Sequence, residues 1–231
     1  MKIAILEAGA PPDVLAGQFG SYSDMFRRLL GPAFKIETFD VRAGHLPEVG
    51  GEAVAYLITG SSSGVYDPDP WIGALQDFVQ AAAGSAPMAG ICFGHQLMAQ
   101  ALGGQVVKSP KGWGVGLHRY EISNPANWMD SGAPIDLPVS HQDQVIAIGP
   151  DAKVLGGSDF TPFGLVAYPG LRAVSLQAHP EFEPDYARAL IASRRGTRFD
   201  EATADAAIDA LAGANDNQRV AVWLRRFLTL A

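Results

Sequence analysis

Apolar residues gather in short segments that alternate with longer amphipathic ones over the first hundred residues. Four short apolar or alternating segments, bounded by Gly, Pro or polar turns, predict strands at residues 2–8, 34–41, 53–60 and 86–91. Apolar residues at helical spacing predict three helices, at residues 21–31, 69–84 and 93–104. This alternation favours an α/β fold, in which an open and mostly parallel sheet carries helices on both faces.

The pattern changes after Gly104. Short strand-like segments with Gly and Pro turns follow at residues 105–122, 135–148, 152–158, 163–168 and 171–182. They predict small antiparallel additions and a return to the main sheet. The alanine-rich chain from residue 184 onward is expected to form three helices. Because the sequence has no internal repeat, low-complexity tract or linker, we expect a single domain over residues 1–231.

Composition narrows the class of protein. The 231 residues are 48% hydrophobic and 18% charged, which is typical of a globular chain with a large core. The net charge of −7 argues against a nucleic-acid partner, because nucleic acids bind basic surfaces. The chain shows neither a signal-peptide pattern nor an apolar segment near the ~20 residues that cross a membrane. We therefore expect a cytoplasmic enzyme or binding protein.

Cys92 is the only cysteine, which excludes an internal disulfide and a multi-cysteine metal site. It lies between a predicted strand and a predicted helix, with Gly90 and Gly94 two residues away on either side. This G-x-nucleophile-x-G form is typical of a nucleophile elbow. The start of a helix favours thiolate, and the N–H of Phe93 is placed to bind an oxyanion. The alternative is a small buried side chain at a strand end.

A nucleophilic thiol needs a general base, and His179 is the strongest candidate. It ends a predicted central strand, so it is expected on the same rim of the sheet as Cys92. Pro180 keeps His179 extended, and Glu181 then faces the same side as the imidazole. The three side chains together predict a set of nucleophile, base and orienting acid.

The other four histidines are weaker candidates for the base. His95 lies in the same predicted helix as the cysteine and is expected to pack. His141 lies in a polar loop between two strands and is a competitor for the role. Two more are expected to be structural or at the surface: His45 and His118.

Two motifs, GICFGHQ at residues 90–96 and QAHPE at residues 177–181, resemble those of class I glutamine amidotransferases of the Cys-His-Glu type. The resemblance spans nearly the whole chain. VSHQDQV, at residues 139–145, is similar to a loop in the glutaminase domain of GMP synthetase. Residues 101–117 look most like free-standing members, including plant γ-glutamyl peptidases. The resemblance implies a flavodoxin-like fold, and no metal or organic cofactor is expected.

The resemblance also implies roles for matching residues. The catalytic residues would be Cys92, His179 and Glu181. Backbone N–H groups of the oxyanion hole would come from Phe93 and from Gly60 or Ser61. The glutamyl part of the substrate would contact Gln96, Ser140, Gln142 and Asp143. Two departures from the family pattern affect the acyl pocket more than the backbone donors: Ala178 replaces an aromatic residue, and Gly60-Ser61-Ser62 replaces Gly-Gly-Pro.

Several functions stay open at this point. The chain could hydrolyse a γ-glutamyl amide, either glutamine or a γ-glutamyl peptide, or it could be a glutaminase subunit that delivers ammonia to a separate synthetase. A catalytically silent binding module and a peptidase or deglycase of another elbow-cysteine family are further alternatives. No synthetase signature of the SGGVDS kind occurs. Residues 7–24 are expected to form a loop near the rim that shapes leaving-group specificity.

Overall fold

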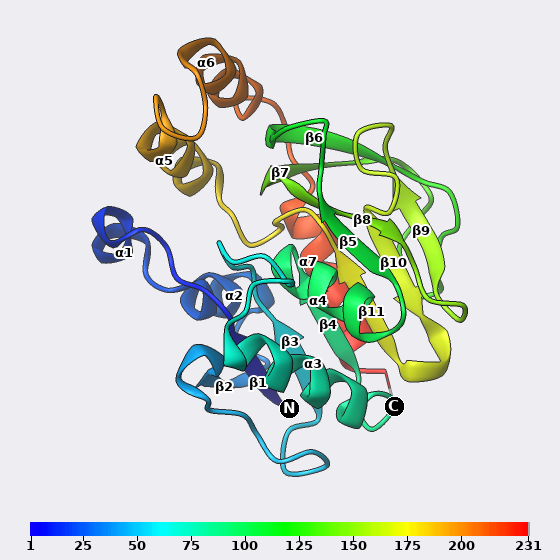
Figure 1. The fold of residues 1–231 in the computed structure, drawn as a ribbon. Helices are drawn as coiled ribbons and strands as arrows, with labels where there is room; N and C mark the ends of the chain where they lie inside the picture. Colours follow the sequence, from blue (N-terminus) through cyan, green and yellow to red (C-terminus); the bar gives the residue numbers. More distant parts are fainter. Residues whose placement is uncertain (231) are drawn as a thin grey trace.

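The structure is a computed structural model that describes residues 1–230, and it is built on one large sheet (Figure 1). The strands of this sheet are β1 (Lys2–Glu7), β2 (Lys35–Asp40), β3 (Ala55–Ile58), β4 (Met88–Ile91), β6 (Gly114–Ile122), β7 (Ile135–His141), β9 (Lys153–Gly157), β10 (Leu165–Tyr168) and β11 (Ala173–Leu176). Their spatial order is β2-β1-β3-β4-β11-β10-β9-β6-β7. A separate two-stranded sheet pairs β5 (Gln105–Lys108) with β8 (Asp143–Ala147).

The sheet divides into a parallel part and an antiparallel part. Strands β2, β1, β3, β4 and β11 run parallel, with β4 next to β11 in register from Met88–Ala173 to Ile91–Leu176. Strands β10, β9, β6 and β7 extend the same sheet with antiparallel pairs. Adjacent parallel strands end at the same edge, so the segments after β4 and β11 meet there. This edge carries Cys92 and His179.

Helices cover both faces of the sheet, as the alternation predicts. They are α1 (Asp13–Phe19), α2 (Tyr22–Leu30), α3 (Pro70–Ala82), α4 (Phe93–Ala101), α5 (Pro184–Arg194), α6 (Glu201–Ala210) and α7 (Asn217–Leu228). Two single 3₁₀ turns lie at Val41–Ala43 and Pro169–Leu171. One face packs against α2 and α7, and the other against α3 and α4. None of the helices within residues 1–230 is long and apolar enough to cross a membrane.

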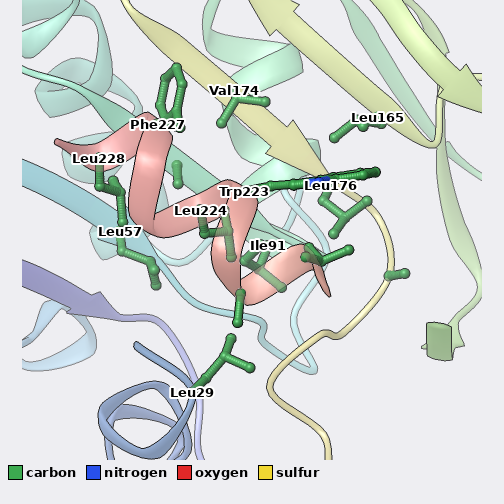
Figure 2. Packing of buried hydrophobic residues seen from close by; sticks show 14 of the residues in the cluster. Leu29, Leu57, Ile91, Leu165, Val174, Leu176, Trp223, Leu224, Phe227 and Leu228 are labelled. Carbon is green, nitrogen blue, oxygen red and sulfur yellow. The ribbon is translucent and has the colours of Figure 1, made fainter. Parts of the chain in front are cut away.

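The core on the α7 face shows how the sequence holds this arrangement. Trp223, Leu224 and Phe227 of α7 point into the sheet, toward Ile91 of β4 and Leu176 of β11 (Figure 2). These side chains are buried. Burial of each such side chain stabilises the fold by roughly 1.5–3 kcal/mol. The strands that end at the rim therefore have a rigid base beneath them.

Helices α5 and α6 stand away from the main layers and contact β6 (Figure 1). A third apolar cluster joins them to α1 and α2 through Leu15, Tyr22, Phe182, Tyr186 and Leu190. Helix α5 begins at Pro184, five residues after His179. The cluster therefore connects α5 to the rim of the sheet.

Residues 7–24 differ from the loop expected there. They contain the seven-residue helix α1, whose Leu15 is buried against the α5 cluster. Helix α1 has no side-chain cap and is preceded by Pro12, so it lacks the start signals that identify α2. By contrast, Ser21 and Asp24 form a full capping box at the start of α2, and Gly31 ends it.

Candidate active site

Cys92 occupies a strained turn between β4 and α4. Its backbone has φ 52° and ψ −102°, and within residues 1–230 the only other non-glycine residue with positive φ is Arg172. The two flanking positions must be glycine, because neither has room for a side chain. A Cβ at Gly90 would lie 2.6 Å from the Gly94 carbonyl oxygen, and a Cβ at Gly94 would lie 2.5 Å from the Ile58 carbonyl oxygen. The elbow predicted from the sequence is therefore present, and it fixes the thiol at the helix start.

His179 and Glu181 form a buried pair beside the thiol. The Nδ1 atom of His179 lies 2.8 Å from Oε1 of Glu181, and both residues are almost inaccessible to solvent. The ring of Phe182 stacks on the imidazole at 3.8 Å between centroids. These contacts fix the ring plane and engage Nδ1, which leaves Nε2 for chemistry.

Gly60 lies against both reactive side chains. A Cβ at this position would be 3.0 Å from Cε1 of His179 and 3.7 Å from Cβ of Cys92. A larger residue would therefore push on the imidazole. The N–H of Phe93, as the first residue of α4, has no acceptor within its own helix. The backbone at Gly60, Ser61 and Phe93 thus surrounds the thiol, where an oxyanion would form.

The electrostatics of the pair favour a protonated His179. Burial by itself lowers the pKa of the imidazole, but the negative charges of Cys92 and Glu181 outweigh it and raise the pKa to about 10. A charged imidazole in this place is an acid ready to protonate a leaving group.

A pair of buried amides connects the thiol to the predicted substrate loop. Nε2 of Gln177 donates a hydrogen bond to Sγ of Cys92 at 3.6 Å, and Oε1 of Gln177 accepts one from Gln96 at 3.1 Å. Gln96 also donates to the carbonyl oxygen of Asp143 at 2.8 Å. The side chain of Gln177 therefore places a donor on the sulfur. Gln177 lies in the QAHPE motif, but nothing in the sequence assigns it a role.

A pocket of about 330 Å³ opens above Cys92. Its lining includes Ser61 and four residues expected to bind substrate: Gln96, Ser140, Gln142 and Asp143. Asp143 also accepts a hydrogen bond from the Tyr66 hydroxyl at 2.8 Å. No residue of the 7–24 segment lines this pocket within the described chain. The leaving-group role expected for that segment gains no support from its position.

The remaining histidines differ from His179 in their partners, since none of them pairs with a carboxylate within residues 1–230. His95 is fully buried, bonds the Ser175 hydroxyl through Nδ1 at 2.8 Å, and has its pKa lowered to about 3 by burial. His141 lines the pocket, but its Nδ1 faces the Asp143 carbonyl and its Nε2 faces Gly114. Burial lowers the pKa of His141 to about 3 as well. His45 is exposed and His118 packs against Phe160. Among these histidines, the carboxylate partner distinguishes His179.

Comparison with known proteins identifies the family to which this chain belongs. The family described as "Glutamine amidotransferase class-I" matches residues 57–195, which include the elbow and the His179 segment. The chain belongs to the class I glutamine amidotransferases. Gamma-glutamyl peptidase 4 of Arabidopsis thaliana is 30% identical over 72% of this chain and 70% of its own length. A GMP synthase of Parafrankia sp. is 34% identical over 55% of this chain, but only 23% of the synthase is covered.

The fold is also that of the family. A solved glutamine amidotransferase of Thermotoga maritima superposes with a TM-score of 0.74 and covers 99% of this chain and 98% of its own, at 18% identity. The flavodoxin-like α/β architecture, with its antiparallel additions, is therefore confirmed. Within residues 1–230, no group of three His, Cys, Asp or Glu side chains is arranged to hold a metal ion.

Several pocket residues of this family member were not predicted. They are Gly64, Tyr66, Asp67, Lys108, Trp113, Arg194 and Arg198, together with Ser62 and Ser63. They come from three stretches of the chain, residues 62–67, 108–113 and 194–198. No local spacing in the sequence connects these stretches to the elbow. Tertiary packing brings them there: the first follows β3, the second joins β5 to β6, and the third begins at the end of α5.

Proposed function

We propose that this amidotransferase hydrolyses a γ-glutamyl amide through a glutamyl thioester on Cys92. The observation that carries the proposal is the buried His179–Glu181 pair beside a thiol held in a strained elbow. A cysteine kept only for packing needs neither the positive φ nor a charged imidazole next to it. The match to the family supports the same chemistry.

In the first half of the reaction the thiolate attacks the γ-carbonyl carbon and a C–S bond forms. The carbonyl oxygen becomes an oxyanion, which the N–H groups of Phe93 and of Gly60 or Ser61 stabilise. When the intermediate collapses, the C–N bond breaks and the nitrogen takes the proton of His179 Nε2. Glu181 holds the imidazole in place and stabilises its positive charge throughout.

In the second half, water attacks the thioester carbon and His179 removes a proton from it. The C–S bond breaks, glutamate leaves, and the thiolate–imidazolium pair is restored. Gln96, Gln142, Asp143 and the Ser140 region hold the glutamyl group during both halves. Their place in the pocket lining supports this role.

The test is hydrolysis by the purified chain, with glutamine, γ-glutamyl dipeptides and glutathione as substrates and glutamate release as the readout. Cys92→Ala should abolish turnover, and His179→Ala should reduce it by about 10³-fold or more. His141→Ala should have a small effect, because Nδ1 of His141 bonds the Asp143 carbonyl oxygen, whereas Nδ1 of His179 pairs with the Glu181 carboxylate. Equal damage from the two histidine variants would contradict His179 as the base.

A second candidate function is a glutaminase subunit that passes ammonia to a separate synthetase. The match to one part of a GMP synthase favours this candidate. It shares every covalent step above and differs only in the fate of the leaving amine. Negligible turnover by the chain alone, with Cys92 still labelled by a glutamine-derived electrophile, would support this alternative. Absence of both turnover and labelling would support a silent binding module instead.

A further inference from the structure

Three cationic side chains line the pocket of a protein whose net charge is −7: Lys108, Arg194 and Arg198. Within residues 1–230, none of the three forms an ion pair with a carboxylate. Cations of one pocket left without partners attract an anionic ligand. The mechanism proposed above uses none of these groups.

Arg194 is the most constrained of the three. It is half-buried at the end of α5, and its only side-chain hydrogen bond within residues 1–230 is from Nη1 to the Ser140 hydroxyl, at 2.8 Å. Burial lowers the pKa of its guanidinium, and no carboxylate offsets this loss of solvation. Other arginines of the same segment are paired: Arg188 with Asp185, and Arg195 with Glu201 and Asp205.

The two carboxylates that line the pocket accept hydrogen bonds and form no ion pair with these three cations within residues 1–230. Asp67 accepts a hydrogen bond from the N–H of Gly64 at 2.7 Å, and Asp143 accepts one from the Tyr66 hydroxyl. Both lie with Gln96 on the side expected to hold the glutamyl group. Lys108 of β5 lies directly opposite Asp143 of β8 in the backbone register of the two strands. Lys108 therefore belongs to the same side of the pocket. An α-amino group and an α-carboxylate can therefore both be bound there.

The side chain of Arg194 bonds the Ser140 hydroxyl and also lies near the His179 side of the pocket, where the leaving group is expected. The charge of Arg194 acts on Tyr22, Tyr186 and Cys92, and the two tyrosines pack around Phe182, which stacks on His179. Because His179 protonates the leaving nitrogen, the leaving group must lie on the His179 side of the scissile bond. Arg198 adds a second charge above the Trp113 ring, at 5.5 Å.

We propose that Arg194, supported by Arg198, binds a carboxylate on the leaving group. The site then prefers γ-glutamyl amino acids and peptides, whose leaving amine carries a carboxylate, over glutamine, whose leaving group is ammonia. A guanidinium matches a carboxylate in both charge and geometry. The inference rests on the proposed function for the identity of the scissile bond.

The test uses two substrates of the same shape, γ-glutamylglycine and γ-glutamylglycinamide, which differ only in the leaving-group carboxylate. The wild-type chain should favour the acid in kcat/KM by about tenfold or more, as expected for a charge-assisted hydrogen bond. Arg194→Gln should reduce this ratio toward one, and Arg194→Lys should restore part of it. The matched control in the same helix, Arg188→Gln, should keep the wild-type ratio, because Arg188 does not line the pocket.

A wild-type ratio near one, or a ratio that survives Arg194→Gln, would overturn the proposal. Equal loss on both substrates would do so as well, since Arg194 would then serve the glutamyl group or the fold. Circular dichroism and thermal melting check that the variants are folded.

A binding measurement tests the carboxylate subsite independently of hydrolysis. With Cys92→Ala, calorimetry should show tighter binding of the acid than of the amide, and the difference should be lost in Cys92→Ala with Arg194→Gln. If the wild-type chain hydrolyses neither substrate, the proposed function fails, and the calorimetry still decides the carboxylate subsite. Equal binding of the two compounds would overturn the subsite even if hydrolysis is observed.

Discussion

At the scale of single residues, the backbone conformation of Cys92 lowers the stability of the fold. Its φ of 52° disfavours every residue with a Cβ by about 1–2 kcal/mol. Glycine adopts this conformation freely but loses more backbone entropy on folding, by roughly 0.5–1 kcal/mol. We therefore expect Cys92→Gly to be more stable than Cys92→Ala by about 0.5–1 kcal/mol, with both variants inactive. Urea denaturation of the pair measures this difference, and an alanine variant as stable as the glycine variant would contradict the strain.

Cys92 and Glu181 together set the pH range over which His179 is charged. Since the pKa of His179 is raised above its ordinary value of 6.5 to about 10, the imidazolium persists as pH rises and is lost only near pH 10. The stabilisation from the pair is present below the ordinary pKa and disappears through the same alkaline range. We expect kcat/KM to fall above about pH 10 in the wild-type chain.

Glu181→Gln removes one of the two charges that raise the pKa of His179. The alkaline fall in kcat/KM should therefore move to lower pH, and activity at neutral pH should drop by about 10²-fold or more. A pH–rate profile of the two proteins measures both effects. A variant that loses activity without any shift of the alkaline limb would show that Glu181 acts on the structure and not on the proton.

At the scale of elements, the elbow depends on α4 approaching the sheet closely. Gly94 permits this approach, because a Cβ there would lie 2.5 Å from the Ile58 carbonyl oxygen of β3. Gly94→Ala should destabilise the fold by about 2–3 kcal/mol and reduce activity together with stability. Gly73 is the matched control, an exposed glycine inside α3 with no atom near its missing Cβ.

Gly73→Ala should stabilise the fold by about 0.5–1 kcal/mol, since alanine is the better helix former. The same substitution is thus expected to lower the stability of the fold in one helix and to raise it in the other. Thermal and urea denaturation of both variants give the comparison. Equal effects at Gly94 and Gly73 would mean that the elbow can relax around an added methyl group.

Elements could be predicted from the sequence where the local signals were complete. Apolar residues at helical spacing over residues 21–31 predicted α2, and the apolar run over residues 86–91 predicted β4. Helix α1 was missed because it is short, uncapped and held mainly by Leu15 packing on the α5 cluster. Such a contact between distant segments leaves no periodic trace in a seven-residue stretch.

At the scale of the whole molecule, the sequence predicted that Cys92 and the His179 segment meet at one rim of the sheet, but it did not predict the whole pocket. The two segments lie in compact motifs, and strand order brings them together. Gln177 lies in the second motif, but only the structure shows its amide against the sulfur. Arg194 reaches the pocket through α5, far from both motifs in the sequence, so spacing along the chain does not connect it to the site.

The mechanism proposed for the whole molecule needs no metal ion in any step. Cys92 supplies the nucleophile, His179 and Glu181 move the proton, and backbone N–H groups stabilise the oxyanion. We therefore expect hydrolysis of a γ-glutamyl peptide to survive dialysis against a chelator, with a rate per chain that is constant over protein concentration. A rate that collapses with the chelator and returns with a divalent ion would place an unassigned metal in the reaction. A rate that rises steeply with concentration would mean that the site is completed by a second chain.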